Sequence, residues 1–232
     1  TGPLGQGLAN AVGMAIAEKI LASKINTKKL KPVDHRTYCF VGDGCLMEGI
    51  SHEVMSLAGV LELNKLICFY DSNGISIDGE IKDWYKDDIK LRCKSYGWKV
   101  IGEIDGHNRD EINQAIVTAK ESNKPTMIVC KTSIGYGAGK KQNSESSHGA
   151  PLGEEALTEL RKNLDWQYKP FEIPESVYAD WDFKEKGKNL EESWKAICAD
   201  HKKNNPEKAT LLKRLISGDL PENFTKAFNN HI

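Results

Sequence analysis

Strand patterns and helix patterns alternate along the first 130 residues, and this alternation restricts the possible folds more than any other feature of the sequence. Short apolar segments typical of buried strands are separated by longer segments with helical spacing. The expected strands are 36–41, 66–70, 98–104 and 126–130, and the expected helices are 8–24, 51–64, 87–96 and 109–122. Right-handed crossovers between such strands produce a doubly wound α/β fold, a parallel sheet with helices on both faces. Any ligand is then expected outside the carboxyl ends of the strands.

The composition changes after the last expected strand. Residues 133–153 are rich in Gly, Ser, Lys and Asn, which is typical of a long loop. Further helices are expected at 154–164, 190–203 and 209–215, whereas the polar residues around Lys184, Lys186 and Lys188, and around Asn204, Asn205 and Pro206, are typical of linkers. The sequence therefore predicts an α/β domain at 1–153, followed by a helical and linker region at 154–232. Helix 8–24 is apolar almost all round, which predicts a buried helix.

Charge, cysteine usage and hydropathy exclude several classes of protein. The chain has 32 Lys and Arg against 33 Asp and Glu, so nothing predicts a nucleic-acid or membrane partner, and an anionic ligand needs a local site. The six cysteines contain no C-x-x-C pair, which is typical of reduced thiols and argues against a cysteine metal site. No apolar segment reaches the roughly 18–20 residues of a membrane span, and no signal peptide is recognisable. We therefore expect a cytoplasmic protein.

Two short polar motifs fall where neighbouring strands are expected to end. Gly42-Asp43-Gly44 follows the first strand and Asn73 follows the second, with residues 45–72 between the motifs. One crossover fills this interval, so we expect the side chains of Asp43 and Asn73 to emerge side by side. Oxygens of Asp, Asn and a nearby backbone carbonyl suit Mg²⁺ or Ca²⁺, and glycines let a diphosphate approach the backbone closely.

Other interpretations of these motifs are weaker. Each motif by itself is also compatible with an ordinary turn. A calcium loop of the EF-hand type that began at Asp71 would need Gly at its sixth position and Glu at its twelfth, where this chain has Ser76 and Lys82. The chain contains neither a P-loop nor a G-x-G-x-x-G motif, which argues against a P-loop nucleotide hydrolase or a nicotinamide-dependent enzyme.

Longer segments around these motifs resemble the transketolase family. GDG followed one crossover later by Asn is the cofactor motif of enzymes that bind thiamine diphosphate. The segments that resemble transketolase are TGPLGQGLANAVGMAIAEK, VGDGCLMEGISHEVMSLAG, FYDSNGISIDG, SHGAPLG and WQYKPFEIPESVYADWD. The resemblance is to the N-terminal, diphosphate-binding domain without its beginning, followed by part of the linker towards the pyrimidine-binding domain. It thus implies the thiamine diphosphate-binding fold.

The resemblance implies a cofactor site with named residues. Asp43, Asn73 and the backbone carbonyl of Ile75 would bind Mg²⁺ or Ca²⁺, and Gly44 would lie beside the diphosphate of thiamine diphosphate. The resemblance also implies three apolar contacts to the cofactor. Gly2 and Leu4 would meet its pyrimidine end, and Ile77 would pack on its thiazolium ring. In an extended segment Ile75 and Ile77 point to the same side, which agrees with such a contact, although a plain core isoleucine fits the sequence equally well.

The resemblance implies catalytic roles for Glu48 and His148. Glu48 lies near the start of the helix after the GDG motif, where an acid also simply suits the helix dipole; the resemblance places it in a carboxylate network across a dimer interface. His148 lies in a polar loop, where a lone histidine is usually solvated, but the resemblance places it near the cofactor, where an imidazole assists proton transfers. The remaining histidines, among them His107 in the turn Asp105-Gly106-His107, receive no catalytic role.

The implied activity is the reversible transfer of a two-carbon ketol group from a ketose phosphate to an aldose phosphate, a reaction of the pentose phosphate pathway. The implied enzyme is a homodimer whose active site also needs the pyrimidine-binding domain of the other subunit. Because that domain lies outside the matched segments, we expect a fragment or one half of a transketolase that is inactive alone. A dihydroxyacetone synthase or another ketol-transferring relative, and a non-catalytic cofactor or interface module, are the alternatives.

Overall fold

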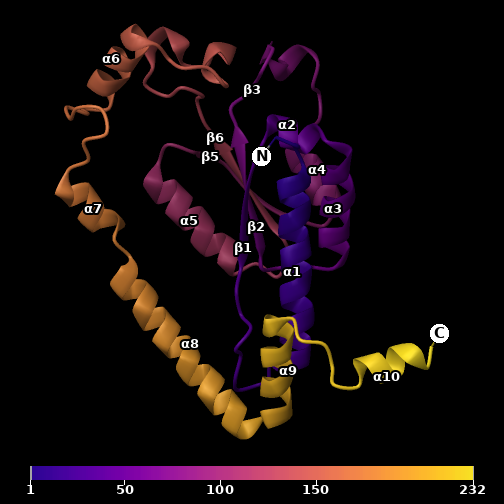
Figure 1. Cartoon of the computed structure of the whole chain (residues 1–232). Coiled ribbons are helices and arrows are strands. Elements are labelled where there is room, and N and C mark those ends of the chain that lie inside the picture. The colour runs from indigo at the N-terminus through magenta and orange to yellow at the C-terminus, as the bar shows by residue number, and fades with distance from the viewer. Residues whose placement is uncertain (1, 232) are drawn as a thin grey trace. The chain divides into compact units, whose positions relative to one another are not determined.

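The computed structural model describes residues 2–231 (Figure 1). These residues form two compact units. The described residues of the first unit are 2–16 and 36–173, and those of the second are 17–35 and 174–231. Helix α1 (Gln6–Ile25) belongs in part to each unit. The domain division at residues 153 and 154 stays a prediction, while the compact units group 154–173 with the sheet and 17–35 with the C-terminal helices.

A four-stranded parallel sheet forms the centre of the first unit. In spatial order its strands are β1 (Thr37–Gly42), β2 (Leu66–Ser72), β6 (Thr126–Lys131) and β5 (Lys99–Asp105). All three pairings are parallel, and the register places Gly42 beside Asp71 and Asp71 beside Cys130. The carboxyl ends of β1, β2 and β6 therefore lie at one edge of the sheet.

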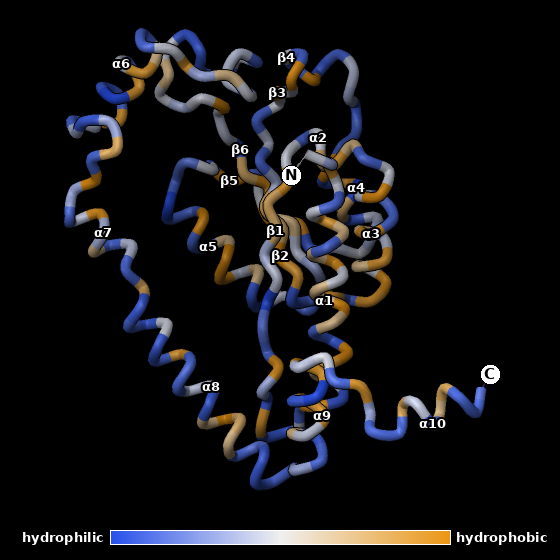
Figure 2. Tube along the Cα trace, viewed as in Figure 1, coloured by the Kyte–Doolittle hydropathy of each residue, from blue (hydrophilic) through white to orange (hydrophobic). Residues whose placement is uncertain are grey.

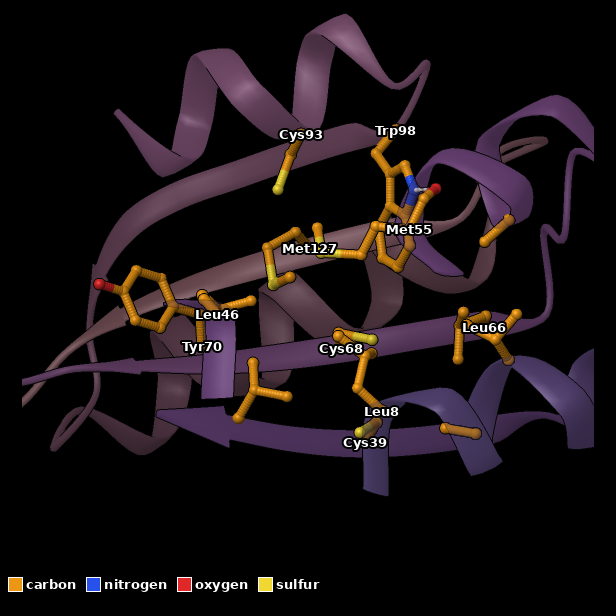
Figure 3. Close-up of a cluster of buried hydrophobic side chains, with 14 of the residues drawn as sticks. Leu8, Cys39, Leu46, Met55, Leu66, Cys68, Tyr70, Cys93, Trp98 and Met127 are labelled. Carbon is orange, nitrogen blue, oxygen red and sulfur yellow. Dashed lines mark hydrogen bonds between the residues drawn. The ribbon is translucent and has the colours of Figure 1, made fainter. Parts of the chain in front are cut away.

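One face of the sheet is covered by helices α1, α3 (Gly49–Val60) and α4 (Ile89–Ser95) (Figure 1). Figure 3 shows the core on this face, in which Met55 of α3 and Trp98 pack among side chains of the strands. Trp98 donates its indole N–H to the backbone carbonyl of Met55 at 2.8 Å. The one polar group of the buried ring is therefore satisfied inside an apolar core.

The opposite face is covered by α5 (Arg109–Lys120). Ile67 and Phe69 of β2 point to this face, because successive side chains of a strand alternate, and they pack with Ala115 and Ala119 of α5. The expected α/β fold, a parallel sheet with helices on both faces, is confirmed.

Helix α1 is buried on one side only. Leu8 and Val12 face the core, whereas the side chains of Met14 and Ile20 are 60% and 49% exposed. The prediction of a helix buried all round is therefore wrong for the described residues. The physical reason is that the sheet packs against a single side of the first half of this helix, while near its C-terminal end His201 of α8 (Lys184–Asn204) contacts the carbonyl of Ile25 at 2.9 Å and leaves Ile20 exposed.

The C-terminal part is more helical than its composition predicts. The residues around Lys184, expected to form a linker, are the first turn of α8 (Lys184–Asn204). The helices in this part are α6 (Glu154–Asn163), α7 (Glu175–Trp181), α8, α9 (Pro206–Ser217) and α10 (Phe224–Asn229). Lys and Glu have high helix propensity, so a charged segment is compatible with a helix as well as with a linker. Only the break at Asn205 agrees with the expected linker, and Pro206 follows it in the first turn of α9.

Helix α8 is largely hydrophilic. Figure 2 shows hydrophilic residues along much of α8, in which only His201 is fully buried.

All six cysteines are free, as expected for reduced thiols. Among the residues that the structure describes, no helix combines the length and the apolar composition that crossing a membrane requires.

Candidate functional site

A cavity of about 900 Å³ opens at the carboxyl ends of the parallel strands, and we call it the strand-end cavity. Residues at or shortly after the ends of all four strands line it, namely Gly42, Asp71, His107 and Thr132. Every site residue predicted from the sequence lines it as well: Gly2, Leu4, Asp43, Gly44, Glu48, Asn73, Ile75, Ile77 and His148. The topology thus brings together residues that are up to 146 positions apart, from Gly2 to His148.

Asp43 is the most buried acid of this cavity. It follows β1 directly and begins the short helix α2 (Asp43–Met47), and its exposed fraction is only 4%. One carboxylate oxygen accepts a hydrogen bond from the hydroxyl of Tyr70, and the other accepts one from the backbone N–H of Gly74 at 3.1 Å. Burial raises the pKa of the Asp43 carboxyl above its ordinary value, although both hydrogen bonds oppose this effect.

Asn73 and Ile75 are brought to Asp43 by the residue between them. The N–H of Gly74 reaches the Asp43 carboxylate from a backbone conformation with φ +74°, which favours glycine. The side-chain oxygen of Asn73 accepts a hydrogen bond from the N–H of Ile75 at 2.9 Å, which fixes the orientation of the amide. Of the three residues predicted to hold a cation, Asn73 and Ile75 are therefore joined directly by a hydrogen bond, and Asp43 is joined to them through Gly74.

This set of oxygen donors fits Mg²⁺ or Ca²⁺. The carboxylate of Asp43, the amide oxygen of Asn73 and the carbonyl of Ile75 are hard ligands, and each carboxylate oxygen keeps a lone pair beyond the hydrogen bond described. Within residues 2–231 no group of three or more His, Cys, Asp or Glu is arranged to hold a metal ion. A cation at this cavity would therefore depend on amide and carbonyl oxygens as well as on one buried carboxylate.

There is little free space beside Gly44. A Cβ atom on Gly44 would lie 3.1 Å from Cδ1 of Leu4, so a larger residue would crowd the cavity at this point. Gly5, with φ +79°, brings the chain close to α3, because a Cβ there would lie 2.8 Å from Ile50 and 2.9 Å from Cβ of Glu48. Gly2 and Leu4 are thus held beside the GDG motif by a glycine turn.

Glu48 lies between two helices and not inside one. It ends α2 and precedes α3 with an extended backbone, ψ 139°, and its side chain makes no capping hydrogen bond. The expected helix at 51–64 begins earlier, at Gly49, and ends earlier, at Val60. Glu48 is exposed at the rim of the cavity, where its carboxylate is free to meet a ligand or another protein.

Ile75 and Ile77 differ in their surroundings. Ile75 belongs to β3 (Ile75–Ser76), which pairs antiparallel with β4 (Gly79–Glu80), whereas Ile77 lies in the turn between them. Ile75 is 7% exposed and Ile77 is 73% exposed. The argument from alternation is therefore wrong, because the extended segment ends at Ser76, although both residues line the cavity.

His148 lies at the end of a compact loop. The loop expected at 133–153 contains two short 3₁₀ turns, Gly139–Lys141 and Glu145–Ser147, and the N–H of His148 donates to the carbonyl of Glu145 at 2.9 Å. Ser147 donates its hydroxyl to the carbonyl of Lys141 at 2.6 Å. The side chain of His148 is exposed to the cavity, and its loop has internal hydrogen bonds that restrict its position.

Comparison with known proteins shows the family of this chain. Residues 1–221 match a family described as the transketolase thiamine diphosphate-binding domain. The chain belongs to this transketolase family. Transketolase 1 of Pasteurella multocida and transketolase 2 of Escherichia coli are each 52% identical to it, over 236 and 233 residues. Both alignments cover 100% of this chain but only 35% of the relative, so the chain spans about a third of the length of these curated relatives.

Solved transketolases share the fold. A transketolase from Pichia stipitis is similar with a TM-score of 0.94 and 38% identity, covering 98% of this chain and 34% of that one. Transketolase from Leishmania mexicana is similar with a TM-score of 0.91 and 39% identity, covering 96% of this chain and 34% of that one. The predicted resemblance to the transketolase family is confirmed.

No role was predicted from the sequence for Arg92, which contacts α2, the helix that begins within the Gly42-Asp43-Gly44 motif. The guanidinium, on α4, donates to the carbonyl of Leu46 in the last turn of α2 at 2.7 Å. It also donates to the carboxylate of Asp87 at 2.8 Å and to the hydroxyl of Tyr85 at 3.3 Å. Arg92 occupies an ordinary position of a helical pattern, so no signal in the sequence identifies this role.

His107 is the second residue that was missed. It lines the strand-end cavity, although the sequence assigned it no role. A signal did exist, because His107 follows the strand expected at 98–104 at its carboxyl end, where ligand-binding residues of α/β proteins gather.

Proposed function

We propose that this chain supplies the diphosphate- and metal-binding part of a transketolase. The proposed enzyme transfers a two-carbon ketol group reversibly from a ketose phosphate to an aldose phosphate. The observation that carries the proposal is the convergence of Asp43, Asn73 and Ile75 on one cavity in a member of the thiamine diphosphate-binding family. Thiamine diphosphate, when bound, supplies the carbanion and the electron sink for cleaving and forming the carbon–carbon bond.

In this proposal the oxygens of Asp43, Asn73 and Ile75 hold Mg²⁺, or Ca²⁺ in its place. The cation offsets the cost of burying the Asp43 carboxylate and balances the negative charge of a diphosphate. Gly44 lets the diphosphate approach the backbone of α2, because a side chain there would meet Leu4. The protein thus supplies a fixed anchor for the charged end of the cofactor.

Apolar residues orient the rings of the cofactor. We assign Ile77 to the thiazolium ring, and Gly2 and Leu4 to the pyrimidine end. The exposed side chains of Leu4 and Ile77 support this assignment, since an apolar ligand surface would remove both from water. Excluding water at this point also protects charged groups from competing hydrogen bonds.

His148 and Glu48 are the proposed catalytic residues of this chain. His148 donates or accepts a proton at substrate oxygens, for which an exposed imidazole at the cavity is suited. Glu48 joins a carboxylate network across the interface of a homodimer, in which the other subunit supplies the pyrimidine-binding domain. The exposed apolar residue Met14 of α1 supports a protein partner, because assembly would bury it.

Sugar phosphates are the proposed substrates. Solved Pichia stipitis transketolases are described as complexes with xylulose 5-phosphate and sedoheptulose 7-phosphate. The transketolases compared above carry no name that favours a dihydroxyacetone synthase or a non-catalytic module. Six free thiols support a reducing compartment such as the cytoplasm, where the pentose phosphate pathway is the proposed setting.

Calorimetric titration of the complete enzyme with thiamine diphosphate and Mg²⁺ tests the proposed anchor. We expect Asp43→Ala and Asn73→Ala each to weaken cofactor binding by about 100-fold or more, because each removes a ligand of the cation. Asp83→Ala is the matched control, since Asp83 is an exposed acid that does not line the cavity. Unchanged affinity in both cavity variants would contradict the proposal.

A further inference from the structure

One wall of the strand-end cavity lies between β6 and His148 and consists of residues 133–135. Its position depends on contacts from another part of the chain. Ser133, Ile134 and Gly135 line the cavity directly after Thr132. Gly135 has φ +62°, and a Cβ atom there would lie 2.7 Å from the hydroxyl oxygen of Ser147. The wall is therefore packed against the residue that precedes His148.

The imidazole of His107 makes one contact at the start of this wall, at Ser133, and one directly after the wall, at Tyr136. The backbone N–H of Ser133 donates to Nε2 of His107 at 3.0 Å. The imidazole also stacks on the ring of Tyr136, with centroids 4.1 Å apart and an interplanar angle of 19°. These two contacts flank Ile134 and Gly135, the residues of the wall that lie between them.

The hydrogen bond determines the form of the imidazole. A ring nitrogen that accepts from a backbone N–H carries no proton, so Nε2 of His107 is unprotonated and Nδ1 carries the hydrogen of a neutral ring. A protonated ring would have no acceptor for Ser133. The contact therefore requires an acceptor at the position of Nε2, which a purely apolar ring of the same shape does not supply.

The turn that carries His107 is itself fixed. The N–H of His107 donates to the carboxylate of Asp105 at 2.8 Å, and the N–H of Asp105 donates to Glu111 of α5 at 2.8 Å. Gly106 donates its N–H to the carbonyl of Lys131 at 2.8 Å. The turn is thus hydrogen-bonded to both β6 and α5, and it gives the imidazole a support with little freedom to move.

The position of this wall affects the position of His148, because the two belong to one hydrogen-bonded and packed loop. The carbonyl of Ile134 accepts a hydrogen bond from the N–H of Asn143 at 2.9 Å, which closes the loop on itself. Gly135 packs on Ser147, the neighbour of His148. A shift of Ile134 or Gly135 would therefore move the segment that presents His148 to the cavity.

We propose that His107 is a positioning residue of this site, which holds Ile134, Gly135 and, through them, His148 in the arrangement that the cofactor and the sugar phosphate meet. This inference rests on the proposed function. His107 acts through the Ser133 hydrogen bond, the Tyr136 stack only orients the ring for this bond, and the residue takes no part in proton transfer.

Two substitutions separate the hydrogen bond from the stack. His107→Gln keeps an acceptor near the position of Nε2 and loses the ring, whereas His107→Phe keeps a ring for Tyr136 and loses the acceptor. His35→Gln is the matched control, because His35 is an exposed histidine that does not line the cavity. The complete enzyme is assayed for kcat, for KM of the ketose phosphate and for thiamine diphosphate affinity.

We expect His107→Phe to lower kcat about 10-fold or more with little change in KM or in the free energy of unfolding, since small misplacements of catalytic groups are costly. His107→Gln should retain kcat within about 3-fold of the parent. Equal losses in both variants, or none in His107→Phe, would overturn the inference. A parent enzyme that binds no thiamine diphosphate would instead refute the proposed function.

A measurement on the unmodified 232-residue chain tests the same contact without activity. Spectra of the chain labelled with ¹⁵N-histidine should show His107 as the neutral form with hydrogen on Nδ1. Amide exchange at Ser133 should be slower in the parent chain than in His107→Phe, by about 10-fold. Hydrogen on Nε2, or equal exchange in the two proteins, would contradict the positioning role whether or not the variant folds fully.

Discussion

Asp43 carries its charge in surroundings that favour the neutral acid. The exposed fraction of its side chain is 4%, and the loss of water raises the pKa of the carboxyl. The neighbouring Tyr70 is affected in the same direction, because burial and the adjacent carboxylate raise the pKa of its hydroxyl. A bound cation would reverse this balance, since it stabilises the carboxylate and competes with the proton. The residue is therefore better suited to binding a metal than to stabilising the cofactor-free protein.

Replacing the charge of Asp43 should consequently have a pH-dependent effect on stability. Because folding raises its pKa, the acid contributes stability that is fully present below the ordinary value of 3.8 and is lost as the pH rises through the raised value. Asn carries no charge at either pH. We expect cofactor-free Asp43→Asn to be more stable relative to the parent chain at pH 7 than at pH 3.5, as measured by urea unfolding at both values. The opposite ordering, or no difference, would show that burial does not dominate.

Helix α2 is too short to be stable without support. Its five residues form barely more than one turn, which costs more conformational entropy than its own hydrogen bonds offset. Two side chains satisfy carbonyls at its C-terminal end, one buried and one half-buried. Ser51 donates its hydroxyl to the carbonyl of Cys45 at 2.5 Å, and Arg92 donates to the carbonyl of Leu46. Support from α3 and α4 thus determines where Asp43 lies.

Removing the guanidinium of Arg92 tests this support. Arg92→Met keeps most of the aliphatic stem but leaves the Leu46 carbonyl without its donor, so we expect a loss of about 2–3 kcal/mol in the free energy of unfolding. Lys90→Met is the control on the same helix, because its exposed ion pair with Glu103 should contribute less than about 1 kcal/mol. Urea unfolding measures both variants. Equal losses would show that Arg92 adds no more than a surface ion pair.

The elements differ in how far the sequence predicts them. Strands 66–70 and 126–130 were predicted to within two residues of β2 and β6, because buried parallel strands are continuous apolar segments between turn residues. The closeness of Asp43 and Asn73 was predictable too, since adjacent parallel strands end at one edge. Arg92 was not predictable, because its bond to Leu46 joins positions 46 residues apart that only tertiary packing brings together. The start of α8 was missed because charge alone does not separate a helix from a linker.

At the scale of the whole molecule, the chain exposes several large apolar side chains that neither compact unit buries. Phe40 of β1 and Val60 of α3 are each 77% exposed, in addition to Met14 of α1. In the second unit, an apolar cavity of about 490 Å³ lies beside Trp194 and Cys198 of α8 and Ile216 of α9. Exposed apolar surface of this kind is typical of chains that assemble with other protein. It supports the proposal that the active enzyme contains more than this chain.

We therefore expect this chain alone to show no ketol transfer, even when it is saturated with thiamine diphosphate and Mg²⁺. In the proposed homodimer the diphosphate end of the cofactor is held by the strand-end cavity and its pyrimidine end by a domain of the other subunit, so one chain anchors only half of the cofactor. In the same proposal, that domain also supplies a carboxylate that activates the aminopyrimidine of the cofactor. Coupled assays with xylulose 5-phosphate and ribose 5-phosphate measure the activity.

Adding a separately produced pyrimidine-binding domain should restore turnover if the two parts associate, and a cavity variant such as Asn73→Ala should abolish the restored activity. Turnover by the chain alone, in a preparation free of host transketolase, would mean that the strand-end cavity orients and activates the whole cofactor unaided.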